Sequence, residues 1–178
     1  MVDACRAGNL PFMARRIDYS ARYTHSTEEV YSALSNRDYW EARMIELRKF
    51  SDNEVESFEV TEDGIDLVFN HLIPRSALPD AAQSVMKKDM VITRKERYSA
   101  FGETVTGTYE ASIPAGPGSL KGTMSLFATD SGSTMRTSSE AKVFIPFIGG
   151  KLEQLMLVNV VDLLRTEARV TSDWLAQQ

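Results

Sequence analysis

The side chains that could do chemistry are few. The sequence has two histidines, His25 and His71, and one cysteine, Cys5. His71 shares the period-two phase of Ile65 and Phe69, so on a strand its imidazole could point inward, donate to a ligand carbonyl or move a proton near neutral pH. The alternative, which such a position favours, is a hydrogen-bonded structural histidine at the end of a sheet. His25 lies beside a predicted helix start, and we expect it on the surface.

A second set of polar residues shares one strand face. Arg94, Glu96 and Tyr98 alternate along a predicted strand. If that face is interior, Arg94 and Glu96 must pair with each other, because unpaired buried charges are very costly, and the pair could hold a polar headgroup. If the face is exterior, the charges are simply solvated. Asn159 interrupts an apolar stripe of the last predicted helix, as a ligand-facing group or as a partner of nearby backbone.

No known catalytic motif accompanies these residues. Metal sites need clustered His, Cys or carboxylate ligands at turn or helical spacing, and the sequence has no such cluster. The segment Ile148–Lys151 lacks the Ser or Thr that follows the lysine of a phosphate-binding loop, and Gly-x-Ser-x-Gly is absent. We therefore expect no catalytic residues, no metal and no cofactor.

Composition narrows the class of protein. The chain has 178 residues, 43% of them hydrophobic, and its 20 Lys and Arg against 25 Asp and Glu give a net charge of −5. The length suits one domain, and the acidic balance argues against nucleic acid as a partner. One cysteine cannot form an intramolecular disulfide, and no apolar run reaches the ~20 residues of a membrane-spanning helix. We expect a cytoplasmic protein, with residues 1–13 as a flexible extension and 14–178 as one domain.

The hydrophobic pattern predicts an α+β domain. Alternation marks a strand at residues 16–23, and a capping box of Ser26 and Glu29 opens the first of two short helices. Six more strands are predicted, over residues 55–61, 65–73, 91–100, 104–113, 119–129 and 134–145. A helical run at 81–88 precedes the strand at 91–100. Evenly spaced hairpins predict one curved, seven-stranded antiparallel sheet. A last helix over residues 151–176 would be about 39 Å long, enough to cross it.

The interior face of this sheet carries many small residues, among them Gly107, Gly122 and Ser139. Small residues opposite a helix indicate either close approach or a gap, and glycines can also mark the bulges that curve a sheet. We predict a hollow interior that binds a ligand between sheet and last helix. Its predicted lining is Phe69, His71, Tyr98, Tyr109, Ala111, Met124, Ala141, Met156, Asn159 and Leu163.

Several segments resemble a known family. They are Thr24–Val30 before the first helix, Tyr39–Arg43, Leu78–Pro79, Lys95–Tyr98 and Ile145–Glu153. Together with the order of elements, they resemble the START/birch-pollen-allergen-like (SRPBCC) superfamily, and within it an uncharacterised, mainly actinobacterial branch. The resemblance covers residues 14–175 and implies a helix-grip fold with a deep apolar cavity for lipids, sterols, polyketides or similar molecules. It implies no particular reaction.

Three functions stay open, and binding or carriage of a hydrophobic small molecule ranks first. A polyketide cyclase/aromatase-type enzyme would need a convergent acid–base set such as His71, Tyr98, Tyr109 and Arg94. A chaperone-activator-like interaction domain would have a filled core and an exposed apolar patch. Enzymatic activity is thus an alternative, and the sequence predicts no oligomeric state.

The connections predict where a ligand enters. Successive connections of an antiparallel meander alternate between its two ends, so the long ones, at residues 73–90, 113–118 and 144–150, collect at one end. We predict the mouth there, gated by residues 74–90 and 146–150. The predicted entrance residues are Leu78, Met86, Phe147 and Ile148. Phe147 and Ile148 could touch a membrane or a donor protein transiently; the alternative is that they plug the core.

Overall fold

A seven-stranded antiparallel sheet frames the computed structural model, which describes residues 15–48, 52–78, 80–84, 86–112, 116 and 118–178. The strand order is β1-β7-β6-β5-β4-β3-β2. The strands are β1 Arg15–Tyr23, β2 Asp52–Thr61, β3 Gly64–Ile73, β4 Met90–Ser99, β5 Thr104–Ser112, β6 Gly118–Thr129 and β7 Gly132–Val143. The predicted α+β class and its seven strands are confirmed. The predicted extension, residues 1–13, lies outside the described residues.

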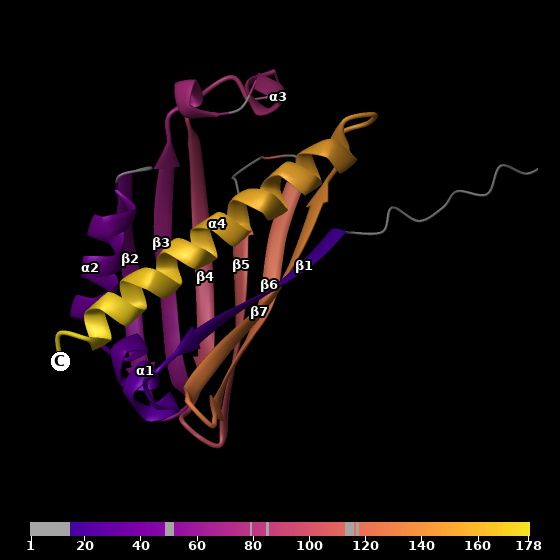
Figure 1. Cartoon of the computed structure of the whole chain (residues 1–178). Helices are drawn as coiled ribbons and strands as arrows, with labels where there is room; N and C mark the ends of the chain where they lie inside the picture. Colours follow the sequence, from indigo (N-terminus) through magenta and orange to yellow (C-terminus); the bar gives the residue numbers. More distant parts are fainter. Residues whose placement is uncertain (1–14, 49–51, 79, 85, 113–115, 117) are drawn as a thin grey trace, which may run out of the picture.

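The helices pack against one face of this sheet. Helices α1 (Thr27–Leu34) and α2 (Arg37–Leu47) follow β1, and α4 (Gly149–Leu175) ends the chain. Figure 1 shows α4 crossing the sheet obliquely; it contacts β1 and β7 and reaches α1 and α2. This is the helix-grip arrangement that the sequence predicts. Within the described ranges, no helix is both long enough and apolar enough to cross a membrane.

Local sequence signals explain where these elements begin. The Ser26 hydroxyl accepts from the Glu29 N–H (3.2 Å), and the Glu29 carboxylate accepts from the Ser26 N–H (2.8 Å), so the predicted capping box is present. Gly64 and Gly132 have φ of 137° and 140°, a region that side chains disfavour, at the turns that open β3 and β7. The β2–β3 and β6–β7 hairpins therefore turn at these two glycines.

A filled core lies between the sheet, the two short helices and the end of α4. Trp40, Tyr39 and Met44 of α2 are fully buried in it, together with Phe69 and Leu126 of the sheet. The Trp40 indole donates to the carbonyl of Leu34 at 2.8 Å, so its polar atom is satisfied. We call this part of the molecule the filled end.

The small residues of the sheet admit neighbouring rings. Gly122 is paired with Tyr109 and Gly107 with Tyr98. A Cβ on Gly122 would lie 2.2 Å from the Tyr109 ring, and one on Gly107 would lie 3.0 Å from the Tyr98 ring. Close approach, one of the two predicted meanings of these glycines, therefore applies at both positions.

The connection from β3 to β4 differs from the prediction. In place of a helical run over 81–88, the structure has a 3-10 turn, η1 (Arg75–Ala77), and one short helix, α3 (Asp80–Gln83). The Arg75 guanidinium explains the difference, because it binds the carbonyls of Met86 (2.9 Å) and Gln83 (3.0 Å). One helical bond follows α3, from the Met86 N–H to the Ala82 carbonyl at 2.8 Å, and the Arg75 side chain binds the carbonyls that end this turn.

Candidate ligand-binding cavity

A cavity of about 510 Å³ lies between α4 and the end of the sheet that the long connections share. Its walls are mostly apolar and come from several elements. The sheet contributes Ile73, Met90, Ile92, Leu120 and Val143, the β3–β4 connection Ala77, Leu78, Ala82 and Met86, and α4 Leu152, Leu155, Met156 and Leu163. The volume falls within the ~300–1,000 Å³ typical of small-molecule sites.

The structure places many of the predicted site residues in this lining. His71, Tyr109 and Ala111 line it from the sheet, and α4 contributes Met156, Leu163 and, as an exposed residue, Asn159. Leu78 and Met86, two predicted entrance residues, also line it.

Other predicted site residues lie elsewhere. Phe69, Tyr98 and Met124 are buried in the filled end, and Ala141 of β7 is buried opposite Leu120; none of the four lines this cavity. Tyr98 and Met124 instead border a gap of about 40 Å³.

The two remaining entrance residues also stand outside the lining. Phe147 is fully exposed with φ of 67°, and Ile148 is the residue before α4.

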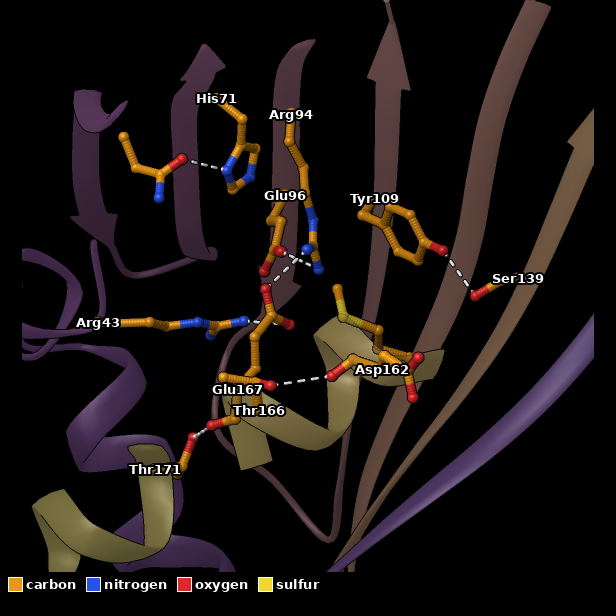
Figure 2. Close-up of polar contacts among 12 residues, drawn as sticks. Arg43, His71, Arg94, Glu96, Tyr109, Ser139, Asp162, Thr166, Glu167 and Thr171 are labelled. Atoms are coloured by element: carbon orange, nitrogen blue, oxygen red, sulfur yellow. Dashed lines mark hydrogen bonds and ion pairs between the residues drawn. The ribbon is translucent and has the colours of Figure 1, made fainter. Parts of the chain in front are cut away.

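Four buried charges, those of Arg43, Arg94, Glu96 and Glu167, lie together, as Figure 2 shows. Arg94 among them lines the cavity, and we call this side of the cavity its inner wall. Arg94 of β4 donates to Glu167 of α4 at 2.9 Å and pairs with Glu96 at 2.5 Å. Arg43 of α2 forms an ion pair with the same Glu167 carboxylate. Two cations thus meet two carboxylates. The interior alternative for the Arg94–Glu96 face is therefore the correct one.

Hydroxyl groups extend this charge cluster. Tyr98 donates to Glu96 at 2.6 Å. Arg43 donates to the Tyr39 hydroxyl at 3.2 Å, and Tyr39 lies 2.8 Å from the Thr171 hydroxyl. Burial alone would raise the pKa of the Glu167 carboxyl, but Arg43 and Arg94 outweigh it and hold that pKa below its usual range. Glu167 is therefore an anion at neutral pH.

His71 is a neutral group in the cavity wall. Its Nδ1 lies 2.5 Å from the amide oxygen of Asn53, which faces it across the β2–β3 pair. Burial, followed by the charge on Arg94, lowers the pKa of His71 to about 4. A carbonyl oxygen can accept but not donate, so Nδ1 carries the hydrogen and Nε2 keeps its lone pair. Nε2 has no hydrogen-bond partner among the described residues.

Tyr109 is engaged with the protein. Its hydroxyl donates to Ser139 at 2.6 Å, and the Arg94 guanidinium lies 4.8 Å from its ring centre. The cavity wall thus combines apolar surface with polar groups that are largely satisfied by one another.

Sequence reasoning did not identify Arg43 and Glu167. Each occupies an apolar phase of its helix: Glu167 follows Leu164 by three residues, and Arg43 lies four residues from both Tyr39 and Leu47. A charged residue at a position where the helical periodicity calls for an apolar one is the signal that could have identified both.

Fold and cavity together define a helix-grip protein with an internal apolar site. The chain belongs to the family described as protein of unknown function (DUF2505), which matches residues 18–175. A relative, the uncharacterized protein Rv0481c of Mycobacterium tuberculosis, is 33% identical over 171 residues, covering 92% of this chain and 98% of that one.

Two solved structures share the fold at low sequence identity. Ara h 8.0201 is 11% identical with a TM-score of 0.54, over 93% of this chain and 100% of that one. The di-domain ARO/CYC StfQ from the steffimycin biosynthetic pathway is 12% identical with a TM-score of 0.57, over 92% of this chain and 52% of that one. At these identities the likeness concerns the fold alone.

Proposed function

We propose that this chain binds and carries a hydrophobic small molecule in the cavity between the sheet and α4. The supporting observation is the cavity itself, since protein interiors are otherwise filled to a density of about 0.75. A water-sized group occupies roughly 30 Å³ in a liquid, so the cavity accommodates on the order of 15–20 non-hydrogen atoms. That size suits a lipid-like or polycyclic molecule.

The runner-up functions gain less support. An interaction domain of the chaperone-activator kind would have a filled core, whereas this one is hollow at one end. A cyclase-type enzyme would need a convergent acid–base set, yet Tyr109 donates to Ser139, Tyr98 donates to Glu96 and Arg94 is paired with two carboxylates. This leaves His71 as the one member of the predicted set with a free ring nitrogen among the described residues. Neither has an observation of its own in its favour.

The test is to fill the cavity. Ala111 is a buried lining residue of β5, and its neighbour Glu110 is exposed on the opposite face. We expect Ala111→Phe to lose the molecules that native mass spectrometry detects on the wild-type protein after incubation with a cellular lipid extract. Glu110→Phe places the same ring outside the cavity and should retain them. Equal binding by both variants would contradict the proposal.

We further propose that the ligand enters at the end of the long connections. Ile73, Met86, Met90 and Leu155 are half-buried lining residues there, as expected at a mouth. Phe147, in the connection between β7 and α4, is fully exposed, and we propose that it meets a membrane or donor protein. We expect Phe147→Ser and Ile148→Ser to slow transfer of a fluorescent fatty alcohol between vesicles while the fold stays intact. Unchanged transfer would contradict this role.

A further inference from the structure

We infer that the ligand carries an uncharged hydroxyl group, which donates a hydrogen bond to Nε2 of His71 and accepts one from Nε of Arg94. This inference rests on the proposed function and names the class of molecule: an apolar alcohol, held with its hydroxyl against the inner wall. Its basis is a pair of buried polar atoms of opposite hydrogen-bonding character in the wall of one cavity.

The acceptor of the pair is Nε2 of His71. His71 is buried, lines the cavity and is fixed in one tautomer by the bond from Nδ1 to Asn53. Its low pKa keeps it neutral, so Nε2 offers a lone pair throughout the physiological pH range. A buried acceptor left unsatisfied costs free energy, which a donor on the ligand would recover.

The donor of the pair is Nε–H of Arg94. Both terminal nitrogens of this guanidinium are engaged, Nη1 with Glu167 and Nη2 with Glu96. Its Nε is buried and, within the part of the chain that the structure describes, has no hydrogen-bond partner. Arg94 also lines the cavity.

The sheet register brings these two groups together. Phe69 pairs with Arg94 and His71 pairs with Ile92, so His71 and Arg94 are diagonal neighbours on one sheet face. Diagonal neighbours lie within reach of long side chains, and both are drawn on adjacent strands in Figure 2. A hydroxyl is the smallest group that both donates and accepts, whereas a ketone oxygen accepts alone.

The charges of the wall argue against an acidic ligand. Arg43 and Arg94 are already balanced by Glu96 and Glu167 in the same buried cluster. A carboxylate beside them would add an uncompensated buried negative charge and would face the lone pair of His71. A neutral headgroup avoids both costs.

The experiment compares three probes of equal carbon number, dodecanol, methyl decyl ketone and dodecanoate, in competition on the full chain by native mass spectrometry. We expect the wild-type protein to prefer dodecanol. His71→Phe should weaken dodecanol binding by roughly 2- to 12-fold, the equivalent of one neutral hydrogen bond, and leave ketone binding unchanged. The control Leu163→Ala removes apolar contact and should weaken all three probes alike.

The outcomes separate this inference from the proposed function. Equal binding of the three probes would overturn the hydroxyl inference and leave hydrophobic binding intact. Preference for the ketone would show that Nε2 carries the hydrogen, and preference for dodecanoate would show that the cluster accepts a further negative charge; either overturns the inference. If no probe binds the wild-type protein, the proposed function fails with it. If His71→Phe does not fold, the ranking of the three probes by their affinity for the wild-type protein still tests the inference.

Discussion

Glu167 joins three elements of the molecule through one carboxylate. Its two oxygens receive Arg94 from β4 and Arg43 from α2, and its own backbone belongs to α4. All three residues are buried, so neither arginine can turn to water if the carboxylate is neutralised. The ion pairs that join α4 to β4 and to α2 therefore share a single negative charge.

Replacing that charge should be costly. We expect Glu167→Gln to lower the free energy of unfolding by about 3–5 kcal/mol, because two guanidinium groups would then share one buried carboxylate. Urea denaturation measures the change. The matched control is Asp173→Asn on the same helix, whose ion pair with Arg169 is exposed and should contribute at most about 1 kcal/mol. Equal effects of the two substitutions would contradict the buried-cluster argument.

His71 should give the fold a characteristic pH dependence. Its pKa is about 4 in the native state, under the influence of burial, Arg94, Glu167 and Arg43, and near 6.5 when unfolded. Between these values the unfolded chain binds a proton that the native chain does not, so stability falls as the pH decreases through that window. The loss approaches about 3 kcal/mol at 1.36 kcal/mol per pKa unit.

The His71→Phe variant isolates this effect. Denaturation at about pH 7 and about pH 4.5 should show a smaller loss of stability in the variant than in the wild-type protein. Groups that do not interact with His71 contribute equally to both and cancel in the comparison, whereas a change at Glu167, whose pKa His71 helps to lower, is part of the effect of the substitution. Parallel losses would mean that His71 binds its proton equally well in both states.

The sequence predicts part of this cluster for a clear reason. Alternation along one strand shows that Arg94, Glu96 and Tyr98 share a face, and burial cost shows that the charges must pair if that face is interior. The partner Glu167 lies 73 residues from Arg94 along the chain, and α2 supplies Arg43 independently. Such long-range pairing has no local pattern, so it required the three-dimensional fold.

At the scale of elements, the β3–β4 connection is the segment most dependent on one side chain. The Arg75 guanidinium binds two carbonyls of the connection, and the Arg75 backbone N–H donates to the Asp89 carboxylate at 2.9 Å. We expect Arg75→Ala to speed dissociation of dodecanol several-fold, since Leu78 and Met86 of this connection line the cavity. Dilution into excess vesicles measures the rate. The control Lys88→Ala, at an exposed position nearby, should leave the dissociation rate unchanged. If Arg75→Ala also leaves the rate unchanged, the β3–β4 connection is not the gate.

Local signals predicted most element boundaries, and this connection shows their limit. The capping box at Ser26 and the glycines at 64 and 132 act within a few residues, so they can be identified from sequence alone. The helical periodicity over 81–88 is equally local, but the Arg75 guanidinium binds the carbonyl of Gln83, which a helix continuing to residue 88 would use for the N–H of residue 87. Tertiary contacts overrule propensity in so short a segment.

At the scale of the whole molecule, one end of the sheet is filled and the other is hollow. The predicted lining of the hollow interior included Phe69, Tyr98 and Met124, but these three residues lie in the filled end. Of the two alternatives at Gly107 and Gly122, close approach is correct and a gap is not, because the Tyr98 and Tyr109 rings occupy the space. Residue size along a strand cannot reveal this, because the filling ring comes from the neighbouring strand.

This division should separate stability from binding. Leu126 is fully buried in the filled end, and Leu163 is a half-buried lining residue. We expect Leu126→Ala to cost about 2–5 kcal/mol of unfolding free energy and to leave dodecanol affinity unchanged. Leu163→Ala should show the reverse, with a small stability loss and weaker binding. Denaturation measures the unfolding free energy of both variants, and native mass spectrometry measures their affinity for dodecanol. If both variants lose stability and affinity to the same extent, the filled end and the cavity are not independent.

Helix α4 spans both ends, and this gives it an uneven rigidity. Glu167 and Thr171 tie its last turns to Arg43, Arg94 and Tyr39, whereas the turns around Met156 border the cavity. In the first turns, among the described residues, only the buried Glu153, which accepts from the Val143 N–H at 2.9 Å, adds a comparable tie, so the helix should open progressively from its first residues. Its amide hydrogens are then expected to exchange with solvent in that order, the first turns long before the last. A bound alcohol would slow the early ones selectively, so that the same helix reports both folding and occupancy.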